Sequence, residues 1–297
     1  MSHAADSSTP GRIETAAFDW KSWLQVLLLA ALISLLYYRI LASLVLQWWK
    51  DPDYSHGFIV PIFCAWVLWK KRKRLAKEPI QPNWFGLVVI LGALGILVLG
   101  VLGADNFLSR TSLLFLLAGC TIQFCGWRYF RAVLFPWVAM FLMIPPPAIL
   151  FNQIAMPLQF FASRLASGLL ALIGVPVLRE GNVIYLPSLT LDVAEACSGL
   201  RFVVALLTLA VFYGYLFETR ISRRIVLILS SIPIAVATNG LRIMGSGVLG
   251  EYWSPDKAEG FFHLYSGWLI FVFSLGLLFL FHAVLGFIDH HRLVRRV

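Results

Sequence analysis

The chain has 297 residues, of which 60% are hydrophobic and only 13% charged, and its mean hydropathy is +0.81. This composition excludes an ordinary soluble domain and predicts an all-α polytopic membrane protein. The net charge of +9 is spread over short basic clusters between apolar runs, and no polar segment is long enough to form a nucleic-acid-binding face. We therefore expect the lipid bilayer, and no nucleic acid, as a partner.

Eight apolar runs follow a polar N-terminal segment. The first run is too long for the apolar region of a cleaved signal peptide, so we expect it to remain as the first span. The runs lie near residues 23–45, 57–69, 84–103, 107–127, 129–144, 199–217, 225–248 and 264–287. They predict about eight transmembrane helices in a membrane domain of residues 23–287, flanked by cytoplasmic tails of residues 1–22 and 288–297.

A further apolar segment, residues 152–174, could form a ninth span. A full crossing there would move the basic stretch 220–224 and the C-terminal tail outside, against the tendency of Lys and Arg to remain on the cytoplasmic side. The motif "IPPPA" breaks the preceding helix, and Pro157 and Arg164 interrupt the run itself. We therefore expect this segment to be interfacial or re-entrant.

A polar stretch, residues 175–201, separates that segment from the sixth run. Apolar and polar residues alternate on both sides of Gly181 and Asn182, and again in "LTLDV". Alternation with period two around a Gly-Asn pair is typical of a β-hairpin. We expect a small extracytoplasmic β-hairpin within an outer-face segment of residues 145–198.

One of the four cysteines stands apart from the others. Cys197 lies at the outer polar boundary, in "AEACSGLR". A helix beginning near Ser198 would direct its positive end at the sulfur, and Arg201 would add a cation one turn away, so both would favour the thiolate. This stretch alone leaves two interpretations open, a catalytic thiolate and a residue that only packs the helix start. The other cysteines fall inside apolar runs, where a thiol usually packs: Cys64, Cys120 and Cys125.

Two residues of later runs would lie at a similar depth. Arg242 sits about two-thirds along the seventh run, where a charge needs a cavity or a partner unless it snorkels to the interface. His263 opens the eighth run, where it could also be a simple interface residue. Because successive helices alternate in direction, both would meet Cys197 at the outer face, and a thiol, an imidazole and a guanidinium suit nucleophilic acyl transfer. Glu195 and Asn239 could orient this site, or they could be solvated or packing residues.

Three other functions compete with acyl transfer. A transporter or channel would place broken helices and polar residues near mid-membrane, whereas the polar residues here gather at one face. An intramembrane serine protease could pair Ser246 with His263, although the Gly-Ser-Gly stretch at 245–247 also suits close helix packing. A zinc site built on Cys197 and His263 would need His56 or a carboxylate as a further ligand. No metal or other cofactor is therefore expected.

The combination of "ACSGLR" at 196–201, "NGLRI" at 239–243 and His263 before a final apolar run resembles the exosortase/archaeosortase family of membrane cysteine transpeptidases. The similarity extends to "PDYSHGFIVPIFCAWVLWKKR" at 52–72 and "VPVLREGNVIYLP" at 175–187, and so covers most of the chain. Each motif is weak alone, but their combination is specific.

The resemblance implies a bacterial inner-membrane enzyme that cleaves PEP-CTERM-like sorting signals of exported proteins. Such a signal has a short motif such as Pro-Glu-Pro, a transmembrane helix and a basic end. By motif match, Cys197 would be the nucleophile, Arg242 the oxyanion or positioning residue and His263 the acid/base, the histidine favouring the bacterial branch. The acyl group would pass through a thioester to an acceptor that the motifs do not identify. Exported proteins with such a signal and this acceptor are the expected partners.

Overall fold

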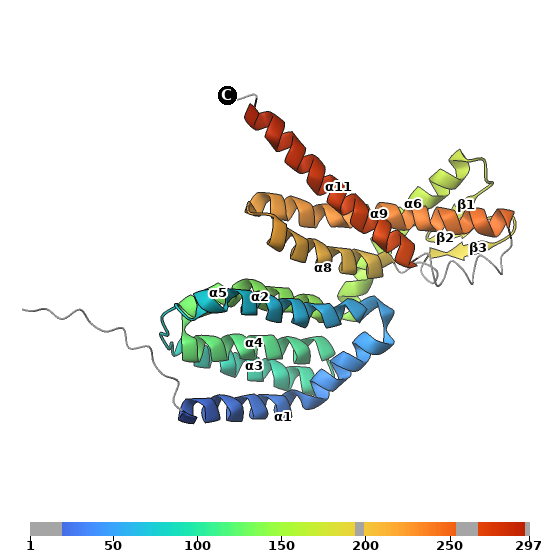
Figure 1. Ribbon diagram of the computed structural model, residues 1–297. Helices are drawn as coiled ribbons and strands as arrows, with labels where there is room; N and C mark the ends of the chain where they lie inside the picture. The colour runs from blue at the N-terminus through green and yellow to red at the C-terminus, as the bar shows by residue number, and fades with distance from the viewer. Residues whose placement is uncertain (1–19, 194–198, 254–266, 295–297) are drawn as a thin grey trace, which may run out of the picture.

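The computed structural model describes residues 20–193, 199–253 and 267–294, and most of these residues are helical (Figure 1). In chain order the helices are α1 (Trp20–Lys50), η1 (Pro52–Phe58), α2 (Ile59–Leu75), α3 (Phe85–Leu102), α4 (Asn106–Cys125), α5 (Trp127–Ala139), η2 (Met140–Met143), α6 (Ala148–Leu172), α8 (Gly199–Phe217), α9 (Ile221–Tyr252) and α11 (Gly267–Val294). Three short strands follow α6, namely β1 (Leu178–Glu180), β2 (Val183–Tyr185) and β3 (Thr190–Asp192).

The described parts of the apolar runs expected to span are almost entirely helical, which confirms the predicted fold class. By length and composition, six of the described helices are able to cross a bilayer, namely α1, α3, α4, α6, α9 and α11, and α8 holds a shorter apolar helix. Helices α2 and α5 are shorter, with 17 and 13 residues. The most apolar windows of α1 and α11 are only 6% and 11% buried, as expected for helices that face lipid. The chain is therefore a multi-pass membrane protein.

Helices α3 and α4 pack along their length because small residues lie between them. A Cβ added at Gly86 would clash with the backbone nitrogen of Gln123 on α4. Asp105 begins α4 as its N-cap, and Gly126 ends it with a φ of 91°, a conformation that glycine adopts easily. These local signals set the bounds of α4 inside an otherwise continuous apolar region.

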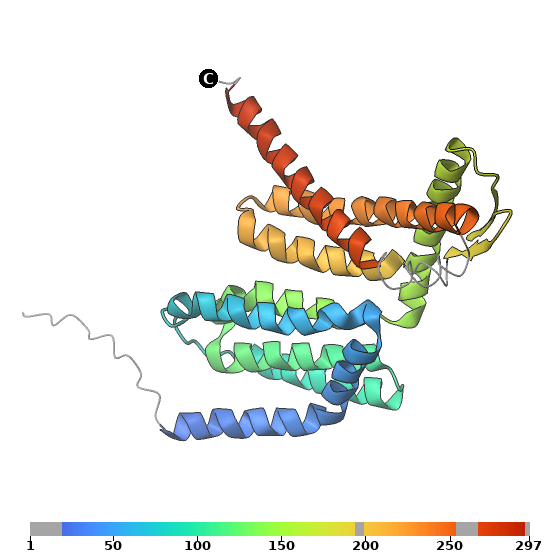
Figure 2. The same cartoon turned by 45° about the vertical axis from the view of Figure 1, so that its right-hand side comes forward.

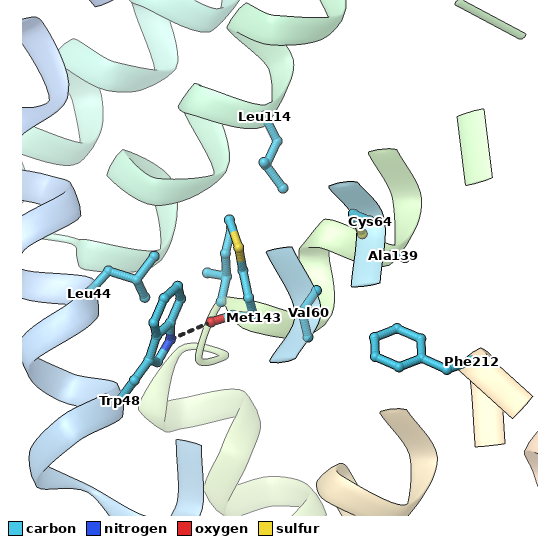
Figure 3. Close-up of a cluster of buried hydrophobic side chains, with 9 residues drawn as sticks. Leu44, Trp48, Val60, Cys64, Leu114, Ala139, Met143 and Phe212 are labelled. Carbon is cyan, nitrogen blue, oxygen red and sulfur yellow. Dashed lines mark hydrogen bonds between the residues drawn. The ribbon is translucent and has the colours of Figure 1, made fainter. Parts of the chain in front are cut away.

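A cluster of buried side chains joins the N-terminal helices to α8 (Figure 3). Trp48 of α1 lies in it and donates a hydrogen bond from its indole Nε1 to the carbonyl oxygen of Met143, at 2.9 Å. Cys64 of α2 is 3% exposed and belongs to this cluster, which confirms its predicted packing role. Phe212 brings in α8, and its ring stacks on that of Phe63 with centroids 3.8 Å apart. Helices α1, α2, α4 and α5 therefore support α8 through one cluster.

Helix α6 differs from the sequence prediction in one respect. Pro157 and Arg164 were expected to interrupt residues 152–174, but both lie inside one continuous helix of 25 residues. A proline removes a single backbone donor, and Arg164 is exposed, so neither ends the helix. In both views α6 crosses α9 at a steep angle, whereas α8 and α9 run side by side (Figures 1 and 2). Its placement at the interface remains a prediction.

The expected hairpin is present and carries a third strand. Strands β1 and β2 pair antiparallel with Glu180 opposite Val183, so that Gly181 and Asn182 form the turn. Gly181 has a φ of 63°, which explains why glycine suits this position. Strand β3 pairs with β2, with Leu191 opposite Ile184, and forms the other half of the alternating pattern seen in the sequence.

Candidate active site

Three helix ends gather at one end of the molecule. Helix α8 begins there, α9 ends there and α11 begins there (Figures 1 and 2). Helix α9 extends past the other two, so Arg242, ten residues before Tyr252 at its end, lies at the level where α8 and α11 start. This arrangement matches the alternating topology from which a common site was inferred.

Arg242 is buried among these helices. Its side chain is 7% exposed, and its guanidinium carbon lies 5.3 Å from the centroid of the Phe202 ring on α8. A cation placed over an aromatic face is stabilised by the ring quadrupole, and the effect is stronger away from water. An arginine that snorkelled to the interface would instead be exposed. Arg242 therefore faces the protein interior, as expected for a charge that has a cavity or a partner, and does not snorkel to the interface.

Phe202 also contacts the start of α11. A Cβ added at Gly267 would lie 3.2 Å from Cζ of Phe202, so glycine allows α11 to approach this ring. One aromatic side chain thus touches both α9, which carries Arg242, and the first residue of α11. Deeper in the bundle, the hydroxyls of Thr238 on α9 and Ser274 on α11 hydrogen-bond at 2.7 Å, and both side chains are fully buried. These contacts hold α11 against α8 at the level of Arg242 and against α9 one turn deeper.

The small sheet is packed onto the same region. Ile184 of β2 and Val193, just after β3, are buried in a cluster with Leu170 of α6 and Ile243 of α9. Ile243 directly follows Arg242, so the sheet is held at the depth of that arginine. The hydroxyl of Ser163 on α6 donates a hydrogen bond to the carbonyl oxygen of Gly181 in the hairpin turn, at 3.1 Å. These contacts therefore hold Val193, the last described residue of this segment, beside α9.

The remaining predicted site residues are placed only in part. Cys197, Glu195, Ser198 and His263 lie outside the described residues. The backbone of Arg201 lies in the first turn of α8. Their roles in acyl transfer stay predictions, and so does the meeting of the thiol and the imidazole.

Asn239 lies one turn before Arg242 on the same face of α9. Its side chain is 3% exposed, and its Oδ1 has no hydrogen-bond partner among the residues that the structure describes. A solvated position for Asn239 is therefore excluded. A buried amide oxygen without a partner is costly and often marks a functional site.

One competing interpretation, the intramembrane serine protease, loses support, whereas Cys197 and His263 of the zinc interpretation lie outside the described residues. The hydroxyl of Ser246 donates a hydrogen bond to the carbonyl oxygen of Arg242 in its own helix, at 3.1 Å. A Cβ at Gly247 would lie 3.2 Å from side chains of α6 and of the strand region, as expected for close helix packing. His56 is largely buried and its Nε2 hydrogen-bonds the carbonyl oxygen of Leu142, at 3.2 Å. Within residues 20–193, 199–253 and 267–294, no three metal-ligating side chains form a cluster.

A polar network at the opposite end of α8 was not found from the sequence. Glu218 is 6% exposed, and its Oε1 lies 2.8 Å from Nε2 of His282 on α11 and 3.4 Å from a guanidinium nitrogen of Arg223 on α9. Nδ1 of His282 lies 2.7 Å from the hydroxyl of Tyr213. The imidazole therefore bridges Tyr213 of α8 and Glu218, the residue that follows α8. Burial would raise the pKa of Glu218, but the hydrogen bond from His282 and the charge of Arg223 outweigh it, and the pKa is lowered. This network ties α11 to α8 far from the candidate site.

A comparison with protein families matches residues 48–280 to the model of the transmembrane exosortase family, Exosortase_EpsH. The match covers most of the chain, including α6, α8, α9 and the part of α11 that begins at the candidate site. No curated protein matches the chain in a sequence search. No solved structure matches it either.

Proposed function

This chain belongs to the transmembrane exosortase family, whose members are membrane cysteine transpeptidases, and we propose that it cleaves C-terminal sorting signals of exported proteins through an acyl-enzyme on Cys197. The observation that carries the proposal is the burial of Arg242 against Phe202, level with the starts of α8 and α11. Cys197 precedes α8 by two residues, and His263 precedes α11 by four. A buried guanidinium at that level could stabilise negative charge that develops beside it during the reaction.

The reaction follows from the chemistry of these three groups. His263 takes the proton of the Cys197 thiol, the resulting thiolate adds to the carbonyl carbon of the scissile peptide, and the oxygen becomes an oxyanion that Arg242 stabilises. The intermediate collapses as the carbon–nitrogen bond breaks, and His263 gives a proton to the departing amine. A thioester remains on Cys197. An amine acceptor, which gives transpeptidation, or water, which gives hydrolysis, then attacks this thioester and restores the thiol.

The fold supports entry of the substrate from the side. Helix α11 has a largely exposed apolar surface, as a helix in contact with lipid does. A substrate whose cleavage motif is followed by a transmembrane helix would diffuse in the bilayer and dock among these helices, with its motif at the site end. The basic clusters near residues 70–77, 128–131 and 220–224 support a cytoplasmic location of the opposite end and of both termini, by the positive-inside rule. The membrane would be the bacterial inner membrane, with the site on its outer face.

The test uses a reporter secreted protein ending in Pro-Glu-Pro, an apolar helix of about 20 residues and an arginine-rich tail. The reporter is co-expressed with the wild-type chain or with Cys197→Ala, and its mass is measured. We expect loss of the tail with the wild type only. Ser246→Ala is the matched control and should process the reporter like the wild type, since its hydroxyl is bonded within α9. Processing by Cys197→Ala, with insertion of that variant confirmed, would overturn the proposal.

A further inference from the structure

A group of basic and aromatic side chains lies at the end of the molecule opposite the candidate active site. Helices α2 and α8 end there, and α5 and α9 begin there (Figures 1 and 2). Tyr215 lies in the last turn of α8, and its ring stacks on that of Phe135 of α5 with the centroids 3.7 Å apart. This stacked pair joins α8 to the N-terminal helices.

Two cations from different helices approach the ring of Tyr215. Nζ of Lys71 on α2 and the guanidinium carbon of Arg224 on α9 each lie 5.5 Å from the ring centroid, and both residues are half-buried. The ring quadrupole stabilises each cation, but two like charges beside one ring also repel each other. An anion bound between the two cations would offset this repulsion.

Both cations have donors to spare within residues 20–193, 199–253 and 267–294. Nζ of Lys71 donates a hydrogen bond to the carbonyl oxygen of Ala132, at 3.2 Å, and Nε of Arg224 donates one to the carbonyl oxygen of Glu218, at 2.7 Å. An ammonium has three N–H donors and a guanidinium has five, so each cation is able to make further hydrogen bonds. The two carboxylates described at this end, Glu78 and Glu218, form their ion pairs with other cations.

Aromatic side chains place this group at the level of lipid headgroups. Trp66 and Trp69 of α2 are both exposed, as expected for tryptophans of an interfacial belt. The ammonium of Lys70 lies over the Trp66 ring at 5.0 Å, and the guanidinium of Arg72 lies over the Trp69 ring at 4.1 Å. Lys71 lies between these two cations in the sequence, so the anions nearest to it in a membrane are the phosphates of lipids.

We propose that Lys71 and Arg224 together bind the phosphate of one anionic phospholipid. Clusters of Lys and Arg beside transmembrane helices bind such headgroups. Phe217 at the end of α8 and Ile221 at the start of α9 are exposed and offer apolar surface to the acyl chains. The arginine-rich tail of the proposed substrate has the same charge as this site, which favours the lipid as its occupant. The bound lipid would hold the end of α2 to the start of α9.

The experiment measures lipid binding by the full chain, purified in detergent, and so does not depend on cleavage of a reporter. Native mass spectrometry follows titrations with phosphatidylglycerol and with phosphatidylcholine of the same acyl chains. We expect phosphatidylglycerol to bind roughly 5- to 10-fold more tightly, because its headgroup carries a net negative charge. Equal affinities for the two lipids would overturn the proposal.

Inorganic phosphate is added to a parallel titration at the concentration of the lipid. It should leave the binding of phosphatidylglycerol unchanged, because it has no acyl chains to contact the protein. Displacement of the lipid by phosphate would show a site for free anions and would overturn the assignment to a lipid.

The variants Lys71→Gln and Lys73→Gln remove the same charge from the same helix, and Lys73 is exposed. Lys71→Gln and Arg224→Gln should each weaken the binding of phosphatidylglycerol roughly 5-fold, the usual effect of one cation near a headgroup. Their combined effect should be smaller than the product of the two, because they share one phosphate. Lys73→Gln should bind the lipid like the wild type. Equal weakening by Lys71→Gln and Lys73→Gln would show an effect of overall charge alone and would overturn the proposal.

The variant Lys71→Arg separates the charge of this residue from its packing. It keeps a cation at the position and should bind phosphatidylglycerol within about 2-fold of the wild type, since an arginine also binds phosphate. If Lys71→Arg loses binding as Lys71→Gln does, the charge of Lys71 does not hold the headgroup and the proposal fails.

Discussion

The guanidinium carbon of Arg242 lies 5.3 Å from the ring centroid of Phe202, and this contact brings α9 and α8 together at the depth where α11 begins. Both side chains are almost fully buried. The position of the Arg242 guanidinium is therefore fixed by the side chains packed around it.

Arg242→Lys is expected to lower the processing rate of the reporter by roughly 10²- to 10³-fold, the usual effect of losing one oxyanion donor. Lysine keeps the charge but lacks the planar fork of five donors that a guanidinium presents. Phe202→Leu should cost less, roughly 3- to 10-fold, because it removes the cation–π contact and retains an apolar side chain. Initial rates measured with purified enzyme in detergent separate the two effects. Equal rates for the wild type and Arg242→Lys would remove this arginine from the reaction.

Glu218→Ala is expected to destabilise the protein by about 2–3 kcal/mol, because it leaves His282 and Arg223 without their shared buried acceptor. Thermal unfolding in detergent gives this difference. The control is Glu78→Ala, which removes a carboxylate whose only described ion pair, with Arg74, is 3.9 Å long and on the surface. Equal unfolding temperatures of the two variants would show that the buried network of Glu218 does not stabilise the protein.

Gly86→Ala is expected to destabilise the pair α3 and α4 by about 1–3 kcal/mol, since the added carbon would meet the backbone of α4 near Gln123. Backbone cannot rotate away as a side chain can. Gly92→Ala in the same helix is the control: its Cβ would meet nothing within 4 Å, and alanine favours the helix slightly. The two variants are compared by thermal unfolding, and a stable Gly86→Ala variant would show that α3 and α4 do not approach as closely as described.

His56 should make the stability of the protein depend on pH. Burial lowers the pKa of its imidazole from the usual 6.5, although the hydrogen bond to Leu142 acts in the opposite direction. The unfolded chain therefore takes up this proton at a higher pH than the folded chain. The stability from neutral His56 is complete above about pH 6.5 and is lost as the pH falls toward the folded pKa.

The measurement compares unfolding temperatures at pH 7.5 and 5.5 for the wild type and for His56→Gln, whose amide can donate a hydrogen bond but does not titrate in this range. The wild type should lose more stability on acidification than the variant. Glu218, whose pKa is lowered, contributes only at still lower pH, below its usual 4.5, so it does not obscure the comparison. An identical pH dependence of the two proteins would exclude His56 as its source.

The sequence predicted those features that depend on local patterns. Continuous apolar runs gave the helices, and the Gly-Asn pair gave the hairpin, because turn chemistry and hydrophobicity act over a few residues. The continuity of α6 through Pro157 was missed, since a proline signal is weaker than the packing of a whole helix. The contact of Arg242 with Phe202 and that of Glu218 with His282, 64 residues away, depend on how helices pack. Neither Phe202 nor His282 carries a motif that would have marked it in advance.

The unpartnered oxygen of Asn239 also had no signature in the sequence. An asparagine in an apolar run was recognised as a candidate, but its missing donor could be seen only when every neighbouring helix was in place. The glycine contacts of α3 and α4 are a similar case, because a glycine in an apolar helix can lie against a neighbour or against lipid, as Gly86 and Gly92 do.

The most direct test of the central claim is to measure the mass of the enzyme itself during reaction with the reporter. Purified wild-type chain should carry an adduct equal in mass to the part of the reporter before the scissile bond. The adduct should map to the peptide containing Cys197 and should be released by hydroxylamine, which cleaves thioesters. It should be absent from Cys197→Ala. Cleaved reporter with no adduct on Cys197, and undiminished cleavage by Cys197→Ala, would contradict the acyl-enzyme mechanism.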